Sequence, residues 1–516
     1  MHLTSQAQYG RLEGRRNVFL QRARESAQLT IPTIMPEEGF HDAGRIRTPY
    51  QSIGARGVNN LAAKLQMALF PPNQSFFRLT VDDYTIAEIT GGNDEARAAI
   101  DEDLATVERS VIGELEGEGM RNPLFEALRH LVVTGNYLLY LPAEGGLKGF
   151  SLDKYVVSRD PSGALKKVII KESFSPDTLE PDVLAIAGYD PLASTADGAT
   201  KSIDVYTCFY KGRKSERGQL RWMTYQEVNG NVIPGTEGDF PLEAPPIMAL
   251  RWCALTDQPY GRSHVEEIYG DLLSLEGLTK AIVDASAASA RLLVLVKPNG
   301  LTNKDAVAKA PNGAVVTGRA DDIEMMQVQK GSDLNVASST ANRIEQRLAQ
   351  AFLMESAVTR DAERVTAEEI RMLSAMLENA LGGVYSVLSN ELQLPLVNRL
   401  MARMTKAKRL PQFPKGVVKP SIVTGLEALG RGHDLTKYGQ LMSMVAQVPE
   451  AMAMVNVGDL VKRVGTSLGL DMDGLIKSAE QIQEEQQQAM MQQTMSSMMQ
   501  SGVDVAAAQE MQNEGE

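Results

Sequence analysis

The sequence has few of the residues that build disulfide frameworks, metal sites or base-stacking surfaces. Its 516 residues include only two cysteines, Cys208 and Cys253, which lie too far apart to form a metal-binding pair. The five histidines are scattered and show no zinc-type spacing. Aromatic residues make up 5% of the chain, which disfavours a surface built to stack nucleic-acid bases. The shortage of cysteine also suits a reducing compartment.

Positive charge and long apolar runs are scarce as well. The formal net charge of -13 argues against a protein that coats DNA, although it does not exclude a local basic patch. The longest apolar run, 292–296, is far shorter than the roughly 20 residues needed to span a bilayer. Five arginines in the first 24 residues, with no apolar run between them, argue against a secretory signal. We therefore expect a soluble chain that is not exported by a signal of its own.

No motif in the sequence signals catalysis. The glycine-rich segment 425–432 lacks the lysine and the Ser/Thr that a phosphate-binding loop uses. The segment 471–474 resembles part of a calcium loop, but its glycine is misplaced and the terminal glutamate is missing. A nucleophile elbow and a dinucleotide-binding fingerprint are also missing from the sequence. These absences predict that the protein is not an enzyme and uses no cofactor and no metal ion.

The apolar pattern predicts a mixed, predominantly α fold of the α+β class. Helical spacing predicts helices over four early segments, 6–30, 51–70, 93–115 and 123–134. Strand-like segments follow at 137–141, 155–157, 167–170, 202–207 and 220–227. The second and third of these flank a Pro-Ser-Gly turn and are expected to form a hairpin. Residues 174–200 are rich in Pro, Asp, Gly and Ala and predict a mobile loop.

Two long helices bracket a small insert in the middle of the chain. Helical spacing predicts these helices over 262–292 and 333–357. A run of small residues at 285–290 would let a neighbouring helix approach closely. The insert between them is predicted to be α/β, with a short helix and two strands near 303–309, 314–317 and 323–328.

The second long helix leads into a short charged loop. Its predicted apolar face repeats at alternating steps of four and three, through Ala337, Ala341, Ile344, Leu348 and Ala351. The chain then breaks over 358–365 and restarts at Thr366, which can cap a new helix together with Glu369. A tight loop of this kind can present Arg360 and Arg364 to a passing molecule, but an ordinary surface turn is the alternative.

A second basic stretch, between residues 399 and 419, offers a weaker candidate. Its arginines and lysines could contact phosphates, although a solvated helix face is the favoured interpretation.

Several blocks of the sequence closely resemble the head-to-tail connector proteins of short-tailed bacteriophages, which are their portal proteins. The blocks are YQSIGARGVNNLAAKLQMALFP (50–71), LFEALRHLVVTGNYLLYLP (124–142), YGRSHVEEIYGDLLSLE (260–276), ERVTAEEIR (363–371), LGGVYSVLSNELQLPLV (381–397) and GLEALGRGHDL (425–435). The resemblance runs in the same order from about residue 20 to 475. It is weak in the first twenty residues, in the 174–200 loop and in the tail.

The resemblance implies a ring, usually of twelve subunits, whose parts are named wing, stem, clip and crown. Carried over to this chain, the parts are a wing with helices and β-hairpins (1–261), a first stem helix (262–292), a clip (293–332), a second stem helix (333–357), a tunnel loop (358–366), a long wing helix with a return segment (367–429), a crown (430–477) and an acidic Gln/Met-rich tail (478–516).

The resemblance also implies a structural role as a conduit for genome packaging and ejection at one capsid vertex. The implied partners are further copies of the chain in a dodecamer, double-stranded DNA, the terminase large subunit, tail adaptor proteins, capsid and scaffolding proteins, and internal core proteins. The implied location is the virion, after assembly in the host cytoplasm. No cofactor is implied.

Two groups of charged residues are the candidate contacts. The tunnel loop carries the residues expected to face DNA, namely Arg360, Asp361, Glu363 and Arg364. The clip carries three candidate basic contacts, namely Lys297, Lys304 and Lys309. Two other classes of protein stay open. A helical scaffold would form filaments or small oligomers without a channel, and an enzyme of nucleic-acid metabolism would need a carboxylate cluster or a phosphate loop.

Overall fold

The computed structural model describes most of the first four-fifths of the chain. The described residues are 3–39, 44–72, 75–91, 93–189, 202–213, 218–289, 293–311, 313–326, 331–354, 376–377, 380–413, 417–422 and 443. Contacts divide the chain into two units, Met1–Asn93 with Thr106–Leu426, and Asp94–Ala105 with Glu427–Glu516. The second unit is described only over 94–105 and at Ser443, and the features below belong to the first, apart from residues 94–105 of one helix.

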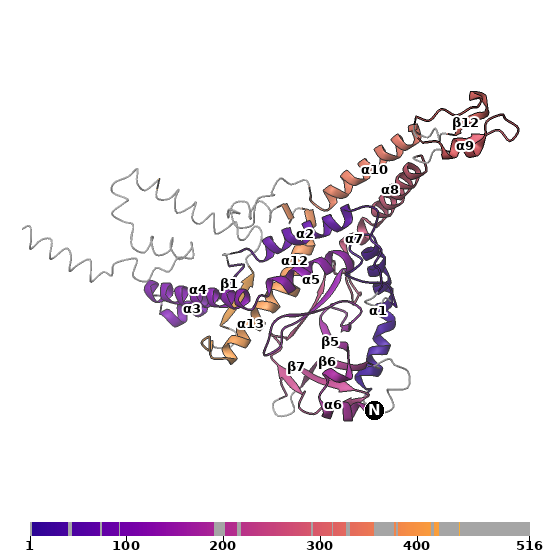
Figure 1. Ribbon diagram of the computed structural model, residues 1–516. Coiled ribbons are helices and arrows are strands. Elements are labelled where there is room, and N and C mark those ends of the chain that lie inside the picture. Colours follow the sequence, from indigo (N-terminus) through magenta and orange to yellow (C-terminus); the bar gives the residue numbers. More distant parts are fainter. Residues whose placement is uncertain are drawn as a thin grey trace, which may run out of the picture. The chain divides into compact units, whose positions relative to one another are not determined.

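The helices predicted in the first third of the chain are present (Figure 1). They are α1 (Ser5–Gln28), α2 (Ile53–Leu69), α4 (Asp94–Gly117) and α5 (Arg121–Thr134). The short helix α3 (Asp83–Thr90) was not predicted from the sequence. One apolar face of α2 is fully buried, since Val58, Leu61, Leu65 and Leu69 are all 0% exposed. α5 packs against both α1 and α2, so these three helices share one core.

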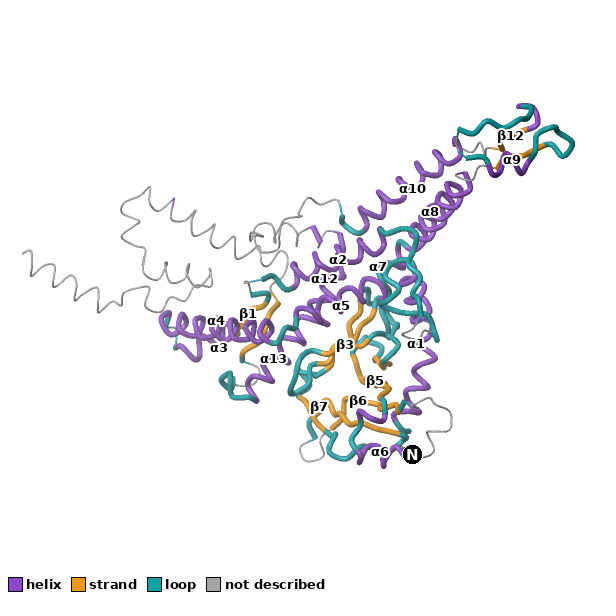
Figure 2. The backbone as a smooth tube through the Cα atoms, in the orientation of Figure 1, coloured by secondary structure: helices purple, strands orange, loops and turns teal. Residues whose placement is uncertain are grey.

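An antiparallel sheet forms the largest β-structure of the described residues (Figure 2). Its strands are β4 (Tyr155–Arg159), β5 (Leu165–Phe174), β6 (Ile203–Arg213), β7 (Leu220–Val228), β8 (Asn231–Val232) and β9 (Gly238–Phe240). They are ordered β4-β5-β6-β7-β8, and β9 also pairs with β7. The predicted hairpin is confirmed, because β4 and β5 pair with Tyr155 opposite Ile170.

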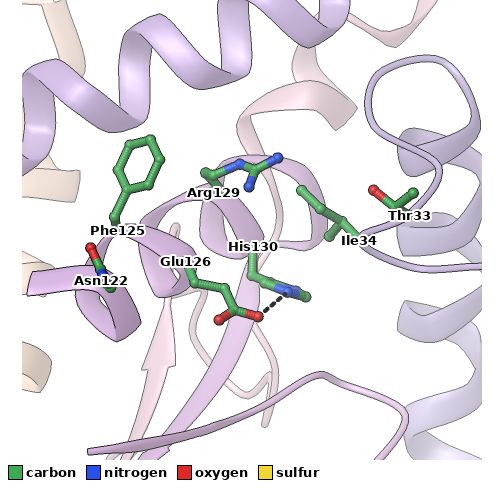
Figure 3. Close-up of a pocket in the computed structure, with 7 residues that line it drawn as sticks. All are labelled: Thr33, Ile34, Asn122, Phe125, Glu126, Arg129 and His130. Atoms are coloured by element: carbon green, nitrogen blue, oxygen red, sulfur yellow. Dashed lines mark ion pairs between the residues drawn. The ribbon is translucent and has the colours of Figure 1, made fainter. Parts of the chain in front are cut away.

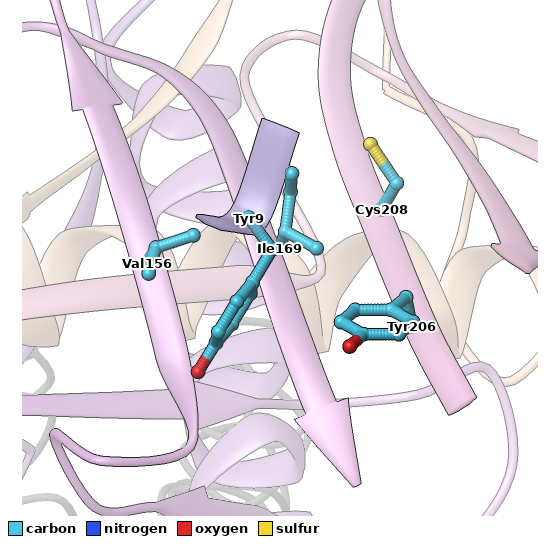
Figure 4. Packing of buried hydrophobic residues seen from close by; sticks show 5 residues of the cluster. All are labelled: Tyr9, Val156, Ile169, Tyr206 and Cys208. Atoms are coloured by element: carbon cyan, nitrogen blue, oxygen red, sulfur yellow. The ribbon is translucent and has the colours of Figure 1, made fainter. Parts of the chain in front are cut away.

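Helix α1 lies against this sheet and closes one small core. Tyr9 packs there with Val156, Ile169, Tyr206 and Cys208 (Figure 4). The rings of Tyr9 and Tyr206 meet edge to face with 5.6 Å between their centroids. The helix and the sheet each bury an apolar face against the other, and neither element could bury that face by itself.

Three smaller antiparallel sheets complete the β-structure of the described residues. They pair β10 (Ile247–Arg251) with β2 (Asn136–Tyr140) and β3 (Lys148–Phe150), β1 (Phe77–Val81) with β13 (Val418–Ile422), and β11 (Leu293–Val296) with β12 (Ile323–Met326). Every residue of β10 is buried, as expected of a strand that is covered on both faces. The first of these sheets contains the strand predicted at 137–141.

The long helices of the middle of the chain are present with shifted ends. The first is divided into α7 (His264–Glu267) and α8 (Tyr269–Ser289). It begins at His264 rather than at 262 because the hydroxyl of Ser263 accepts a hydrogen bond from the Glu266 amide at 3.0 Å and caps the helix. The second is α10 (Gly331–Ala351), which ends earlier than the sequence predicted.

Two predictions for loops and strands were wrong in detail. Residues 174–200 were expected to be a loop, but they contain a 3-10 turn, Pro176–Thr178, and the helix α6 (Pro181–Ala187). Pro181 stands in the first turn of α6, where its missing amide hydrogen costs nothing. The strand expected near 314–317 does not form, because β12 pairs with β11 instead, and Val315 is fully exposed.

The helical segment between residues 383 and 406 is divided into three parts. It comprises α12 (Gly383–Leu388), a π-helical turn (Ser389–Gln393) and α13 (Leu394–Lys406). Gly382 has a φ of 48°, a conformation that glycine adopts without strain, and it breaks the single long helix expected here. The crown and tail expected beyond 430 lie outside the described residues, apart from Ser443.

Candidate functional site

Helices α8 and α10 lie side by side and carry the small insert at their far end (Figure 1). The apolar face predicted on α10 is the face that packs, since Ala341, Ile344 and Leu348 are 9%, 7% and 0% exposed. Leu272 and Leu275 are buried on α8. Because these residues are three or four positions apart, their side chains lie on one side of each helix. The two sides meet in an apolar seam between α8 and α10.

One ion pair joins the two helices beside this seam. A guanidinium nitrogen of Arg347 donates to the carboxylate of Asp271 at 2.7 Å. The pair is largely exposed, so it contributes no more than about 1 kcal/mol to stability. The apolar seam therefore provides most of the attraction between α8 and α10.

The outer surfaces of the same two helices are partly apolar. Leu273 and Val283 on α8 are 52% and 48% exposed, and Val336 on α10 is 67% exposed. The small residues Ala287 and Ala288 are also exposed near the end of α8. A pair of helices buries only the seam between them, so these side chains are available to another chain. They form the outer apolar face of the pair, defined here as Leu273, Val283 and Val336.

The insert between the helices is organised around one buried carboxylate. Asp322 is 8% exposed and accepts hydrogen bonds from the amides of Leu301 and Thr302 at 2.9 and 3.3 Å. It also accepts the Thr302 hydroxyl at 3.1 Å. These bonds tie the loop after β11 to the turn before β12. The insert therefore has a defined shape of its own despite its small apolar core.

The three lysines expected to make basic contacts, Lys297, Lys304 and Lys309, lie on the surface of this insert. Lys297 follows β11, while Lys304 and Lys309 open and close α9 (Lys304–Lys309), and all three are exposed. Two apolar side chains are exposed beside them in sequence, Leu301 at 81% and Val315 at 100%. The insert thus presents both positive charge and apolar surface, a combination that suits contact with a protein.

The tunnel-loop residues lie outside the described part of the chain. Arg360, Asp361, Glu363 and Arg364 all fall between residues 355 and 375, so their roles stay predictions. The described chain reaches Met354, three residues after α10 ends. The structure defines how that end of α10 is held.

Two arginines of the basic stretch that begins at Arg399 are buried, which the sequence did not reveal, whereas Lys406, Lys408, Arg409 and Lys419 are exposed. Arg399 and Arg403 are 5% and 7% exposed. Arg399 donates to the Leu141 carbonyl at 3.1 Å and lies 4.8 Å from the centre of the Phe240 ring. Arg403 and Arg409 each donate to the Glu114 carboxylate at 2.7 Å. Arg399 and Arg403 are therefore internal structural residues, whereas Arg409 pairs with Glu114 and keeps about half of its side chain exposed.

The carboxylate of Glu114 is the centre of this ion-pair cluster. Burial disfavours its ionised form, but hydrogen bonds from Arg409 and Arg403 outweigh burial and hold the pKa of Glu114 below its usual value. Replacing Glu114 with glutamine is expected to lower the free energy of unfolding at pH 7 by about 2 kcal/mol, because Arg409 loses its counter-charge and buried Arg403 keeps only that of Glu118. Chemical denaturation at a series of pH values measures this difference.

The pH dependence of the difference has a definite sign. A lowered folded-state pKa contributes stability above the ordinary carboxyl value of about 4.3, and this contribution is lost as the pH falls through the folded value. The gap between wild type and Glu114→Gln should therefore narrow below about pH 4. Glu118→Gln is the matched control, since Glu118 also pairs with Arg403 but is 30% exposed. Equal losses in both variants would contradict the central role of Glu114.

A pocket of about 340 Å³ lies beside α5 (Figure 3). Its lining residues are Thr33, Ile34, Asn122, Phe125, Glu126, Arg129 and His130. Glu126 lies 3.8 Å from the imidazole of His130, which also stacks on the Tyr137 ring at 4.4 Å. The neighbouring His130 lowers the pKa of Glu126. The histidine is thus held by contacts with a carboxylate and an aromatic ring, as a structural residue is.

Two kinds of feature are missing from the part of the chain that the structure describes. In that part of the chain, His, Cys, Asp and Glu side chains form no cluster of three that could hold a metal ion. Of the helices described, none is both long and apolar enough to cross a membrane.

Comparison with known proteins finds matches along nearly the whole chain. The family model of the bacteriophage head to tail connecting protein matches residues 4–476. The portal protein of Escherichia phage T7 is 39% identical over 507 residues, which cover 97% of this chain and 91% of that protein. The portal protein of Enterobacteria phage T3 is 39% identical over 510 residues, which cover 98% and 92%.

A solved structure gives a more distant match. The neck of an empty GTA particle matches with a TM-score of 0.38 and 14% identity, covering 75% of this chain and 86% of that one. A similarity of this size supports no argument about the present chain, whereas the sequence matches do.

Proposed function

This chain belongs to the family of bacteriophage head to tail connecting proteins, and from that membership we propose that it forms a ring of twelve subunits at one capsid vertex. The observation that carries the proposal is the match to two phage portal proteins over more than nine-tenths of the chain. We propose further that the ring is a passive conduit for the genome and has no enzymatic activity of its own.

In this proposal, helices α8 and α10 form the stem and the insert at 293–332 forms the clip. Residues 1–261 and 367–429 form the wing, and 430–477 form the crown. The outer apolar face of the helix pair supports the stem assignment, because a ring would cover Leu273, Val283 and Val336 with neighbouring helices. The clip assignment is supported by the exposed lysines and apolar residues of the insert, which suit a protein partner.

The clip would bind two successive partners at the outer end of the ring. During packaging it would dock the terminase large subunit, whose ATPase activity would drive double-stranded DNA inward. After packaging it would bind tail adaptor proteins. Lys297, Lys304 and Lys309 are the proposed basic contacts for acidic surfaces of these partners, since all three are exposed. The ring would contact capsid, scaffolding and internal core proteins at its other surfaces.

The tunnel loop would act on the DNA inside the channel. Symmetry places one copy of each loop residue per subunit around the channel, so Arg360 and Arg364 would form rings of positive charge. Asp361 and Glu363 would moderate that charge. The net charge of -13 per chain fits a conduit, because extensive phosphate neutralisation would make the duplex adhere to the wall. The protein would assemble in the host cytoplasm and remain in the virion.

The ring itself is the first part of the proposal to test. Purified full-length protein is expected to form rings with a central hole in negative-stain electron microscopy. Native mass spectrometry is expected to give a mass near twelve times 56.2 kDa. A dimer without a channel under all conditions, including the presence of scaffolding protein, would contradict the proposal and favour a helical scaffold.

A further inference from the structure

The C-terminal end of α10 is held by side chains from two other helices. The last turn closes with hydrogen bonds from the Leu353 amide to the Gln350 carbonyl at 2.9 Å and from the Met354 amide to the Ala349 carbonyl at 2.8 Å. This is the Schellman arrangement, in which one residue adopts a left-handed conformation. Leu353 occupies that position with a φ of 53°.

A leucine is an unusual choice for that position. Glycine is the common residue there, because a side chain in the left-handed conformation costs roughly 1–2 kcal/mol. The chain therefore leaves α10 in a strained direction that the surrounding contacts must maintain.

Side chains around the end of α10 donate hydrogen bonds to the carbonyls that the helix itself leaves without a partner. The imidazole of His264 donates to the Ala351 carbonyl at 3.1 Å. The amide of Asn60 donates to the Phe352 carbonyl at 3.0 Å and to the Leu353 carbonyl at 3.3 Å. The ammonium of Lys64 also donates to the Leu353 carbonyl. Helix ends normally leave such carbonyls to water, so three consecutive side-chain contacts form a built site.

The packing around these donors is equally close. Phe352 is fully buried, and its ring lies 5.7 Å from that of His264. Gly57 faces the same ring so closely that an added methyl group would lie 2.3 Å from it. Gly57, Asn60 and Lys64 are spaced by three and four residues, so they occupy one face of α2.

Lys64 differs from a surface lysine in its burial and in the direction of its charge. Its side chain is 6% exposed, and burial lowers its pKa. A buried lysine is retained at a desolvation cost, and here its charge is directed at the negative end of the α10 dipole. This arrangement stabilises one particular exit direction of the chain after Leu353.

We propose that Asn60, Lys64 and His264 form a clamp that positions the chain where it leaves α10 and thereby sets the place of the loop at 358–366 in the channel. This inference rests on the proposed function of that loop. Seven residues span from Leu353 to Arg360, a short tether, so the direction fixed at Leu353 limits where the arginines can lie. The three residues of the clamp are positioning residues and are not expected to touch DNA.

The test compares Lys64→Met with Gln66→Met in the full-length ring. Methionine keeps the long apolar stem of the lysine and removes its donor. Gln66 is the matched control, because it also donates one hydrogen bond from α2 to a backbone carbonyl, that of Arg121, at 2.7 Å. Hydrogen–deuterium exchange of peptides covering 351–366, thermal unfolding, and DNA retention in assembled particles are measured for both variants.

Lys64→Met is expected to speed exchange over 351–366 by about tenfold, the amount that loss of one charged hydrogen bond allows, and to lower DNA retention. Exchange in α5 should be unchanged, and Gln66→Met should show neither effect. Unchanged exchange at 351–366 would overturn the clamp, as would faster exchange spread evenly over all helices. Asn60→Ala replaces Lys64→Met in the same test if the lysine variant does not fold.

The failure of the clamp and the failure of the loop assignment are distinguishable. Arg360→Ala with Arg364→Ala is measured in parallel. If the arginine variant loses DNA and Lys64→Met retains it despite faster exchange, the positioning role is wrong. If the arginine variant retains its DNA, the proposed function of the loop is wrong, and the exchange data still decide whether the clamp fixes the end of α10.

Discussion

Replacing Arg360 and Arg364 together with alanine is expected to leave the ring intact and to lower the DNA retained in filled particles by about tenfold. The expected effect is large because twelve subunits would each lose two positive charges around one duplex. Retention is measured as the ratio of filled to empty particles in density gradients and as the fraction of DNA that a nuclease can reach. The difference from wild type should shrink as the ionic strength rises, since salt screens the arginine–phosphate attraction that the variant lacks.

Two further double variants separate the position of the charge from its amount. Arg45→Ala with Arg47→Ala removes the same two charges from exposed residues remote in sequence, and it should retain DNA normally. Arg360→Lys with Arg364→Lys keeps the charge and should retain most of the function. Full heads at normal yield from the Arg360/Arg364 alanine variant would remove this loop from the retention mechanism.

Placing aspartate at both Leu273 and Val283 is expected to reduce ring formation at least tenfold while the single chain remains folded. Both side chains are about half exposed in one subunit, so the substitutions should change its melting temperature little. In a ring, however, each carboxylate would be buried at every interface without a partner, which costs several kcal/mol per interface. Native mass spectrometry and electron microscopy give the ring fraction directly.

Val232→Asp is the matched control for the stem variant. Val232 is 44% exposed and lies on β8 of the large sheet, away from the helix pair. It should therefore leave both the melting temperature and the ring fraction unchanged. If Leu273→Asp with Val283→Asp still forms rings at the wild-type yield, the outer apolar face of α8 is not a subunit interface.

Local patterns in the sequence predicted the parts of the fold that depend on neighbours along the chain. The alternating steps of four and three through Ala341, Ile344 and Leu348 predicted the packing face of α10, and all three residues are buried. The same kind of pattern placed α2 and the β4/β5 hairpin. Such elements are specified by periodicity, which one sequence contains in full.

Periodicity along the chain cannot predict contacts between segments that are far apart in the sequence. The arginines at 399, 403 and 409 look like a solvated basic helix face, because nothing near them in sequence indicates that Glu114 pairs with two of them. The break at Gly382 has a visible signal in the two consecutive glycines, but helical periodicity on either side of it favoured one continuous helix.

The clamp left a signal in the sequence that was not recognised. Asn60 and Lys64 are polar residues on a helix whose other positions on that side are apolar or glycine. Polar side chains at such positions must find partners when the helix is packed. The partners of Asn60 and Lys64 are the backbone carbonyls of residues 352 and 353. Every residue has a backbone carbonyl, so the side chains at 352 and 353 could not have identified these partners.

Because α8 and α10 are equally long, a tilt of the helix pair at one end displaces the other end in proportion to the helix length. Each helix has 21 residues, which at a rise of about 1.5 Å per residue makes an arm about 30 Å long. The clamp lies at one end of α10 and the insert lies beyond the other. A tilt of about 5° at the clamped end would displace the insert by roughly 2.6 Å, given this length. Binding of a protein at the insert would therefore exert torque on the same three carbonyls from which the chain continues toward Arg360.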